Sequence, residues 1–329
     1  MSLHRLGRSD LAITPVGLGA WAIGGGDWCF GWGPQSDQDS IATVRRAIDR
    51  GLNWIDTSNV YGLGRSERLI GRALRGVARP DRPYVFTTCG FVWDDLGNVS
   101  YSLDPRAIRR EAEASLTRLA LDTIDLYQID APVGMVQAQG AEDGSAALEE
   151  AWRTLADLQR EGKVRAIGLA NHAPWHLALV ERIAPVASLQ VPYSLLHRGI
   201  EEAVLPDCLE RGIGVIAASP LASGLLTGAM TSERLRWMPH NDWRRRSPCF
   251  GPAHVAHARH AVERLERLGD RHGVGPGAVA IAWTLRHPAI TGAAAGARRP
   301  DQVDELATAL TLQLTGADVD ALATSGVTT

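Results

Sequence analysis

Residues 147–171, ALEEAWRTLADLQREGKVRAIGLAN, contain the structural unit from which the fold can be inferred. The stretch 147–161 predicts a helix, because its apolar residues recur at helical spacing. Gly162 is a typical stop signal after a helix. The apolar run 164–170 then predicts a buried strand, and the polar Asn171 follows it directly. A helix leading into a buried strand is typical of an α/β protein with a parallel sheet.

The same alternation of short apolar runs and longer amphipathic stretches occurs along the whole chain. Further helices are predicted at 39–50, 105–119 and 201–211, and a longer helical region at 256–287. Eight strands, each leading to a helix, predict an α/β fold of the (β/α)8 TIM-barrel type. The predicted strands are residues 15–19, 52–56, 84–88, 124–130, 164–170, 188–190, 214–219 and 290–296.

Residues 1–329 are interpreted as one domain, because barrels of this length are routinely single domains. The opening segment through Ile13 predicts an N-terminal hairpin that turns at residues 8–10 and caps the bottom of the barrel. No Gly-x-Gly-x-x-Gly motif follows the first strand, which disfavours a doubly wound dinucleotide-binding domain.

The charge and the cysteine content of the chain indicate which kinds of binding partner to expect. The formal net charge is −3, so no basic surface is expected to bind nucleic acid or acidic membranes. No apolar run approaches the roughly 18 residues that span a bilayer, and the first residues lack a signal-peptide arrangement. The four cysteines are far apart and show no metal-site spacing. We therefore expect a cytoplasmic protein that has a small-molecule substrate and no bound metal.

Polar residues stand at or just after the ends of successive predicted strands. The C-terminal ends of barrel strands converge on one cup, where such enzymes build their active sites. Polar residues at so many matching places predict a site in this cup. They are Asp56, Thr88, Asp130, Asn171, Gln190, Ser219 and Arg298.

Several of these positions lie in motifs that resemble those of the aldo-keto reductase superfamily. The run GLNWIDTSNVYGLGRSERLIGRAL (51–74) resembles the motif that places an aspartate and a tyrosine in the cup. Similar matches cover essentially the whole chain, about residues 3 to 325. They are LDTIDLYQIDAP (121–132), EGKVRAIGLANH (161–172), SLQVPYSLLHR (188–198), GIGVIAASPLASGLLTG (212–228) and GAAAGARRPDQVDE (292–305).

The resemblance implies a catalytic set, but one with a non-standard tetrad. In this family hydride passes from the nicotinamide to a carbonyl carbon while a tyrosine donates a proton. Asp56 and Tyr61 match that set, whereas Thr88 stands in place of a lysine and Asp130 in place of a histidine. Without the positive charge of the lysine, Asp56 would raise the pKa of Tyr61. Ordinary carbonyl reduction should therefore be impaired. The single lysine, Lys163, is expected in a turn at the barrel bottom.

Three interpretations of Asp130 remain open. It is a solvated carboxylate in a pocket that has lost its activity, or it is a general acid. The second follows because two carboxyls in a small, partly apolar cup repel, so that one stays protonated near neutral pH. A glutamate at this position in related steroid reductases promotes reduction of a conjugated C=C. The third interpretation is redox-neutral elimination, epimerisation or cyclisation, with Asp130, Tyr61 and Asp56 as acid and base.

The resemblance also assigns residues to cofactor binding. The loop after the seventh strand matches a pyrophosphate loop, whose backbone N–H groups hold phosphate. Arg298 and Gln302 match a grip on a 2′-phosphate, which favours NADP(H) over NAD(H). Ala218 departs from the pattern, because it replaces the aromatic residue on which a nicotinamide stacks. The predicted cofactor-binding residues are Asn171, Gln190, Ser219, Leu221, Ser223, Gly224, Arg298 and Gln302.

Aromatic residues in 24–37, GGGDWCFGWGPQSD, predict a wall of the substrate pocket after the first strand. Segment 233–250 mixes arginine and tryptophan, and we interpret it as a lid over the cofactor because the acidic total charge disfavours a nucleic-acid site. His172 is a candidate substitute for the missing histidine. The predicted substrate-pocket residues are Trp21, Trp28, Phe30, Trp32, Trp93 and His172.

The leading hypothesis is an NADPH-dependent reductase with an altered active site. It would act on a conjugated or sugar-derived ketone in specialised metabolism. Two alternatives remain: a redox-neutral lyase, isomerase or cyclase that keeps the pocket, and a catalytically silent binding protein.

Overall fold

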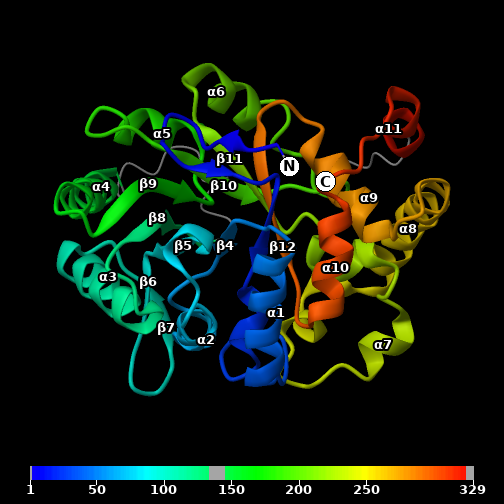
Figure 1. Ribbon diagram of the computed structural model, residues 1–329, viewed down its shortest axis with the longest axis horizontal. Coiled ribbons are helices and arrows are strands. Elements are labelled where there is room, and N and C mark those ends of the chain that lie inside the picture. Colours follow the sequence, from blue (N-terminus) through cyan, green and yellow to red (C-terminus); the bar gives the residue numbers. More distant parts are fainter. Residues whose placement is uncertain (1, 133–144, 324–329) are drawn as a thin grey trace.

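The computed structural model describes residues 2–132 and 145–323. In this part of the chain, eight parallel strands close into one barrel, and helices surround it (Figure 1). The predicted (β/α)8 fold is confirmed, and the predicted strand bounds agree closely with the observed ones. In order around the ring, the strands are β10 (Ser188–Pro192), β11 (Gly214–Ala218), β12 (Ile290–Gly296), β3 (Val16–Gly19), β4 (Trp54–Asp56), β5 (Tyr84–Cys89), β8 (Ile124–Asp130) and β9 (Val164–Ala170).

The α-helices lie outside the ring of strands. They are α1 (Asp37–Asp49), α2 (Arg65–Ala73), α3 (Pro105–Leu119), α4 (Ser145–Arg160), α5 (Pro174–Val180), α6 (Val204–Arg211), α7 (Ser232–Arg236), α8 (Pro252–His272), α9 (Pro276–Leu285), α10 (Pro300–Thr308) and α11 (Gly316–Ala323). Short 3-10 helices also occur: η1 (Trp21–Gly24), η2 (Arg79–Asp81), η5 (Ala222–Thr227), η6 (Trp243–Arg246) and η7 (Pro248–Phe250).

The longer helical region predicted at 256–287 is helical over most of its length, but it consists of two helices, α8 and α9. α8 ends at His272, and Gly273 follows in the left-handed conformation with φ 68°. α9 then begins at Pro276, whose missing N–H is tolerated in the first turn of a helix. The apolar spacing continues across this break, which is why the pattern did not reveal it.

The predicted N-terminal hairpin is confirmed. Strands β1 (His4–Arg5) and β2 (Ala12–Ile13) pair antiparallel. Between them, Leu6 and Leu11 are fully buried against the inside of the barrel. Gly7 has φ 54°, and a Cβ there would lie 2.3 Å from the Ala187 carbonyl oxygen, so no other residue fits this close approach. The hairpin closes the end of the barrel at which the strands begin.

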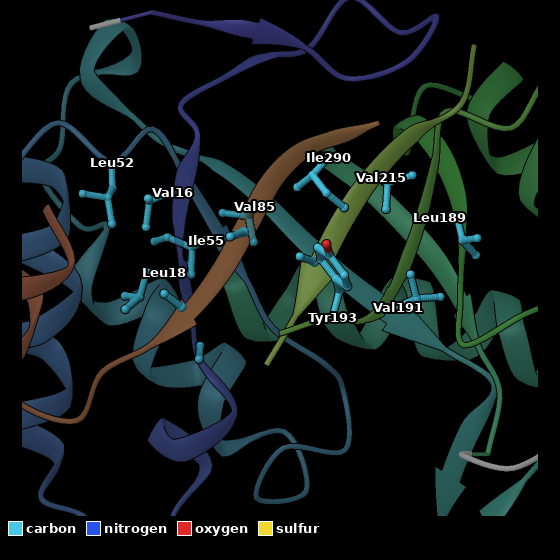
Figure 2. Close-up of a cluster of buried hydrophobic side chains, with 14 of the residues drawn as sticks. Val16, Leu18, Leu52, Ile55, Val85, Leu189, Val191, Tyr193, Val215 and Ile290 are labelled. Atoms are coloured by element: carbon cyan, nitrogen blue, oxygen red, sulfur yellow. The ribbon is translucent and has the colours of Figure 1, made fainter. Parts of the chain in front are cut away.

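Two apolar layers hold the barrel together. The outer layer fills the space between strands and helices, and Figure 2 shows part of it, including Val16, Val85 and Val215. The inner layer fills the barrel below the cup and includes Phe86 and Leu126. Burying one such side chain stabilises the fold by about 1.5–3 kcal/mol. The filled interior leaves only the C-terminal ends of the strands open for a site.

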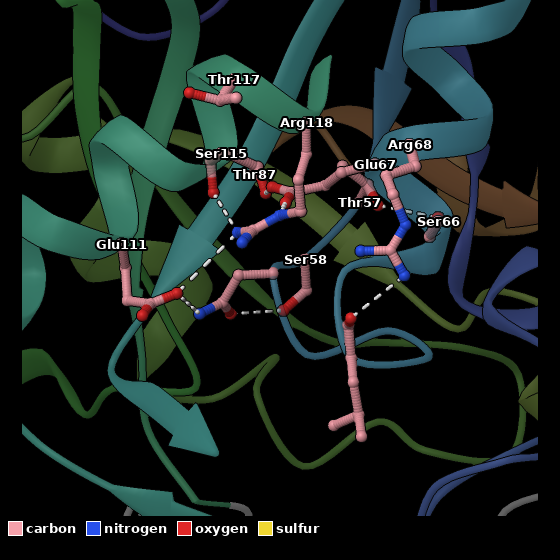
Figure 3. A network of polar contacts seen from close by, with 12 residues as sticks. Thr57, Ser58, Ser66, Glu67, Arg68, Thr87, Glu111, Ser115, Thr117 and Arg118 are labelled. Atoms are coloured by element: carbon pink, nitrogen blue, oxygen red, sulfur yellow. Dashed lines mark hydrogen bonds and ion pairs between the residues drawn. The ribbon is translucent and has the colours of Figure 1, made fainter. Parts of the chain in front are cut away.

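A buried ion pair behind the cup joins α2, α3 and β5 (Figure 3). Arg118 Nε donates to Glu67 Oε2 at 2.5 Å, and the other oxygen of Glu67 accepts from Thr87 Oγ1 at 2.7 Å. The side chain of Glu67 is 0% exposed and that of Arg118 13% exposed. Asn59, in the loop after β4, donates from Nδ2 to Glu111 Oε2 at 3.2 Å. The same polar network therefore anchors the loop that leads to the cup.

A second hairpin, which the sequence pattern did not predict, follows β5. Its strands β6 (Phe91–Trp93) and β7 (Val99–Tyr101) pair antiparallel. The Arg118 guanidinium lies over the Trp93 ring, 5.4 Å from its centroid. This contact directs Trp93 toward the buried ion pair.

The single lysine lies at the strand-start end of the barrel, opposite the cup. Lys163 immediately precedes β9 and forms ion pairs with Glu113 and Glu161. Its predicted place in a turn at the barrel bottom is confirmed.

Two kinds of feature are absent from residues 2–132 and 145–323. No helix there has the length and apolar character needed to cross a membrane. No group of histidine, cysteine, aspartate and glutamate side chains there is arranged to hold a metal ion.

Candidate active site

The strand ends converge on a cavity of about 380 Å³. Its wall extends from Asp56 and Tyr61, after β4, to Arg298 and Gln302, after β12. Many of the residues predicted from the sequence border it. They are Trp21, Trp32, Asp56, Tyr61, Gln190, Ser219, Leu221, Ser223, Gly224, Arg298 and Gln302.

Other predicted site residues do not border this cavity. Two of them, Asp130 and Asn171, still lie close enough to form one hydrogen-bonded pair beside it. The other predicted residues that lie outside the cavity wall are Thr88, Trp28, Phe30, Trp93 and His172.

Asp56 is the carboxylate at the floor of the cavity. It is 5% exposed, and its Oδ2 accepts from Gln190 Nε2 at 3.0 Å. Its Oδ1 is buried and has no hydrogen-bond partner among the described residues. Burial raises the pKa of Asp56 to about 7, against the hydrogen bond from Gln190. An unpaired buried oxygen of this kind is costly, and in native proteins it commonly marks a functional position.

A chain of amides supports Asp56 from inside the barrel. Gln190 Oε1 accepts from Gln128 Nε2 at 2.6 Å, and Gln128 Oε1 accepts from Ser188 Oγ at 3.2 Å. Gln190 therefore faces Asp56 and Gln128 in this structure. Sequence reasoning missed Gln128 because it lies within β8 rather than at its end. Its only signal is a polar residue inside an otherwise apolar strand.

Asp130 is the second carboxyl of the cup and lies at the end of β8. Its Oδ1 accepts from Asn171 Nδ2 at 2.8 Å. Asn171 adopts a left-handed φ of 59°, which turns its amide toward Asp130. Burial first, and the nearby charge of Asp56 as well, raise the pKa of Asp130 to about 7. Asp130 can therefore hold a proton near neutral pH.

Tyr61 follows β4 and shares the cavity wall with Asp56. Burial, followed by the charges of Asp56 and Asp130, raises its pKa well above the ordinary value. Its phenol therefore keeps its proton. The backbone at Gly62 has φ 61°, and a Cβ there would lie 2.1 Å from the Gly24 carbonyl oxygen. This close approach fixes the loop that carries Tyr61 against η1.

Thr88, in β5, is hydrogen bonded away from Asp56. Its Oγ1 donates to Ser58 Oγ at 2.7 Å, in the loop after β4. The threonine therefore supplies neither a charge nor a hydrogen bond to the cup. Its predicted catalytic role stays a prediction, and the observed contact is with the loop.

Aromatic rings form one side of the cavity. Trp21 stacks on Tyr61 at a centroid distance of 6.0 Å and on Trp243 at 5.2 Å. Trp32 meets Trp21 edge-on at 5.2 Å. Trp28 lies outside the cavity wall but 6.0 Å from the Tyr61 ring. The aromatic cluster comprises Trp21, Trp28, Trp32, Tyr61 and Trp243.

Trp243 and Arg244 are site residues that sequence reasoning did not single out. Both lie in η6, within the segment interpreted as a lid, and Arg244 borders the cavity. Arg244 pairs with Asp242 at 2.7 Å and lies over the Trp32 ring at 4.3 Å. The β-bridge between Trp32 and Asp242 joins this segment to the loop after η1. In the sequence, these two residues are marked only by the arginine- and tryptophan-rich composition of the segment, because its apolar residues do not recur at helical or strand spacing.

The remaining predicted pocket residues have other surroundings. His172 is 2% exposed, its Nδ1 lies 2.8 Å from the Ala170 carbonyl oxygen, and it meets His176 edge-on at 4.9 Å. Burial lowers its pKa to about 3, so it stays neutral. Phe30 is 53% exposed, and Trp93 lies under Arg118. Their proposed substrate contacts remain predictions without support from this geometry.

The loop after β11 is strained where a phosphate site was predicted. Ser219, Ala222 and Ser223 have positive φ values of 52°, 47° and 54°, and Gly224 has φ 98°. Each non-glycine residue in this region costs about 1–3 kcal/mol, and such strain clusters at ligand clamps. Three of these residues border the cavity, Ser219, Ser223 and Gly224.

The two residues predicted to grip a 2′-phosphate have internal partners in this structure. Arg298 donates from Nε to Gln35 Oε1 at 2.8 Å, and also to the carbonyl oxygens of Trp32 and Pro34. Gln302 accepts the backbone N–H of Arg298 at 2.8 Å and so caps α10. Gln35 was not recognised from the sequence. A phosphate bound here would have to compete with the Gln35 amide oxygen for Arg298.

Positive charge nevertheless gathers at this outer end. Arg234, Arg244, Arg298 and Arg299 all border the cavity there. Burial, followed by the charge of Arg244, lowers the pKa of Arg298. Arg299 pairs with Asp301 at 3.0 Å and Arg244 with Asp242, whereas Arg298 is held by neutral oxygen acceptors and keeps its charge uncompensated. The cavity thus has an acidic, aromatic inner end and a basic outer end.

We expect the buried carboxyl of Asp56 to make stability depend on pH. With a folded-state pKa of about 7 against about 4 in the unfolded chain, the folded state binds the extra proton between these values. The contribution of this group therefore falls as pH rises from about 4 to about 7. Asp56→Asn should gain stability relative to the parent protein, on the order of a few kcal/mol, between about pH 5 and pH 8.

The measurement is urea unfolding followed by tryptophan fluorescence at the two pH values. Asp122→Asn is the matched control, because the side chain of Asp122 is 96% exposed. A difference between Asp56→Asn and the parent protein that stays constant with pH would show that Asp56 is ionised throughout.

Comparisons with known proteins agree with this geometry. The Aldo/keto reductase family profile matches residues 15–325. Aldo-keto reductase YhdN of Bacillus subtilis is 33% identical over 307 residues, covering 93% of this chain and 88% of that protein. The NADH-specific methylglyoxal reductase of Escherichia coli is 34% identical over 323 residues, covering 95% and 94%.

Solved structures give the same result. The glycerol dehydrogenase of Gluconobacter oxydans superposes with a TM-score of 0.83 at 33% identity, covering 98% of this chain and 94% of its own. An aldo-keto reductase from Bacillus halodurans in its holo form superposes with a TM-score of 0.76 at 22% identity, covering 99% and 97%. The second likeness concerns the fold alone.

Proposed function

Because the chain belongs to the aldo/keto reductase family, a family of oxidoreductases that use nicotinamide cofactors, we propose that it is an NADP(H)-binding reductase with an altered active site. The single observation that carries this proposal is that Tyr61 and Asp56 border the same cavity. Thr88 and Asp130 stand where the family resemblance places a lysine and a histidine. The altered tetrad thus keeps the proton donor and loses the cation that assists it.

The cavity fits a dinucleotide in two respects. Its strained loop at Ser219, Ser223 and Gly224 can direct backbone N–H groups at a pyrophosphate. Its outer end carries arginines that can bind a further phosphate. Gln190 borders the inner end and can bind a carboxamide if it turns from Asp56. When bound there, a reduced nicotinamide supplies the hydride.

The residues of this chain then handle the proton. The raised pKa keeps Tyr61 protonated, so its O–H can donate to a substrate oxygen. Asp130, with its pKa raised to about 7, can act as a second acid beside the cavity. Trp21 borders the cavity and stacks on Trp243 behind it, which makes this side of the site apolar. Such a site suits a conjugated or sugar-derived ketone, in which either acid has an oxygen to protonate.

The proposal is tested with purified protein, NADPH or NADH, and two substrates, 2-cyclohexenone and dihydroxyacetone. We expect substrate-dependent loss of nicotinamide absorbance, and quenching of tryptophan fluorescence when the cofactor alone is added. If neither NADPH nor NADH gave absorbance loss or fluorescence quenching, the proposed function would be overturned. Turnover with NADH alone would retain the reductase and reject the preference for NADP(H).

Arg298→Met tests the preference for NADP(H) separately. If Arg298 leaves Gln35 to bind a 2′-phosphate, the dissociation constant of NADPH should rise about 10- to 100-fold. That of NADH should change less than about 3-fold, because NADH lacks this phosphate. Calorimetric titration measures both constants. Arg106→Met, at an exposed position in α3, is the control. Equal weakening of both cofactors would assign Arg298 a structural role only.

A redox-neutral reaction is the second candidate function. It is favoured by one observation, the two carboxyls of Asp56 and Asp130 at the strand ends, each held by a side-chain amide and contacted by no cation of the described residues. Such a pair can remove a proton at one position of a substrate and return it at another. Substrate turnover by the protein without any nicotinamide, if it depends on Asp56, Asp130 and Tyr61, would favour this alternative. We do not propose a silent binding protein, because the family assignment points to an enzyme.

A further inference from the structure

The carboxyl groups at the inner end of the cavity lack a positively charged partner among the described residues. Among the described residues, Asp56 Oδ1 is buried without a hydrogen-bond partner, and Gln190 is the one side chain that bonds to this carboxyl. Asp130 receives one side-chain hydrogen bond, from Asn171. No cation of the described residues contacts either carboxyl, and Thr88 donates to Ser58 instead. A buried carboxylate without such a partner is unfavourable unless it takes up a proton or a cationic ligand.

The four arginines that border the cavity all have other partners, and Arg234 donates to the Ala229 carbonyl oxygen. Arg244 pairs with Asp242, and Arg299 pairs with Asp301. Arg298 is hydrogen bonded to Gln35 and to backbone carbonyls. The described residues therefore supply no cation to Asp56, and a cationic ligand from outside the protein can fill this role in place of a proton.

Aromatic faces beside Asp56 suit the same kind of ligand. The Tyr61 ring lies 6.0 Å from both Trp21 and Trp28. Organic ammonium groups are attracted to tyrosine and tryptophan faces, and the attraction grows when water is excluded. The buried indole N–H of Trp32, which borders the cavity, also has no hydrogen-bond partner among the described residues. It can donate to an oxygen atom of a ligand that carries a hydroxyl as well as an amine.

Resting on the proposed reductase function, we propose that the substrate is a ketone that carries a protonated amine close to its carbonyl group. Its ammonium binds Asp56 at the open Oδ1 and supplies the positive charge that Thr88 does not. The substrate thereby completes the catalytic set that Asp56 and Tyr61 begin. An uncharged ketone would leave Asp56 unpaired and Tyr61 without a positive neighbour.

The chemical step balances with groups already named. Hydride from a dihydronicotinamide forms the new C–H bond, while the π electrons of the C=O bond move to oxygen. The Tyr61 O–H bond breaks and its proton forms the new O–H bond. The ketone becomes an amino alcohol, and the cofactor is oxidised. The tyrosinate left at Tyr61 lies beside the substrate ammonium, which stabilises it until a proton from water restores the phenol.

The test compares two probes that differ in one group. These are trans-2-aminocyclohexanol, a cation at neutral pH, and trans-cyclohexane-1,2-diol, its uncharged counterpart. Calorimetric titration of the protein should give an amino alcohol affinity at least about 10-fold tighter than that of the diol. Asp56→Asn should abolish this preference, and Asp122→Asn, at an exposed carboxyl, should keep it. Equal binding of both probes, or a preference that survives Asp56→Asn, would overturn the proposal.

A second variant keeps the test decisive if Asp56→Asn does not fold. Thr88→Lys places an ammonium next to Asp56, so it should remove the preference for the amino alcohol. It should also raise kcat/KM for cyclohexanone at least about 10-fold. Undiminished amine binding in Thr88→Lys would also overturn the proposal.

The two proposals fail in different ways. Amine binding without any nicotinamide-dependent turnover would reject the reductase function and keep the cation site. Nicotinamide-dependent turnover of uncharged ketones, without any preference for the amine in binding, would keep the reductase function and reject the cation site.

Discussion

Tyr61→Phe should lower kcat for nicotinamide-dependent reduction by about 10²- to 10⁴-fold, which is the usual contribution of a positioned acid. The expected loss is large because burial and the charges of Asp56 and Asp130 keep the Tyr61 phenol protonated, and therefore able to donate. Phenylalanine preserves the ring that stacks on Trp21, so the aromatic cluster should remain. Steady-state kinetics at saturating cofactor measure the change, which should appear in kcat more than in KM.

Tyr84→Phe is the matched control for this substitution. Tyr84 begins β5 at the opposite end of the barrel, where the Arg165 guanidinium lies 5.3 Å from its ring centroid. Its activity should stay within about 2-fold of the parent protein. If Tyr61→Phe retained most of its kcat, the proton would have to come from Asp130. The double variant with Asp130→Asn would then identify that carboxyl as the acid.

Arg118→Ala should lower the free energy of unfolding by about 3–5 kcal/mol, because it leaves the carboxylate of Glu67 buried without its cation. Glu67 is fully buried, and its remaining side-chain donor is the hydroxyl of Thr87. The substitution also removes the guanidinium that covers Trp93. Urea unfolding measured by circular dichroism tests this value. The loop after β4 should loosen as well, because Asn59 and Glu111 belong to the same network.

Arg109→Ala is the control for this comparison. Arg109 also lies on α3 and pairs with Glu161 at 2.8 Å, but the two side chains are 40% and 38% exposed. An exposed pair of this kind contributes about 0–1 kcal/mol. If both variants lost the same stability, burial would not be the cause. A loss of less than about 1 kcal/mol in Arg118→Ala would contradict the expected cost of leaving Glu67 buried without its cation.

The barrel was predictable because its parallel strands are buried on both faces. Such strands appear in sequence as short apolar runs, and Val164–Ala170 is an example. The β6–β7 hairpin was missed for the opposite reason. Its strands are short and only partly buried, so they carry no clear period. The break between α8 and α9 was missed because Gly273 interrupts the backbone but not the apolar spacing.

The site was predictable where it depends on the ends of strands. Asp56 and Gln190 were found in this way, and both border the cavity. Side-chain directions were not predictable, because they depend on which partner lies within reach. Thr88 bonds to Ser58, and Arg298 bonds to Gln35, although each was expected to serve the ligand. Trp243 was missed as a site residue because the segment between β11 and α8 has no repeating pattern.

The lone lysine has a practical consequence. Apart from the amine at the chain start, Lys163 is the only place where an amine-selective reagent can attach to this protein. It lies at the end of the barrel away from the cup, so a dye, spin label or surface tether placed there would leave the cavity mouth unobstructed. Its neighbours Glu113 and Glu161 raise its pKa and so slow the coupling reaction, which mildly alkaline buffer would offset. A protein immobilised through Lys163 would have its ligand entrance facing the solvent.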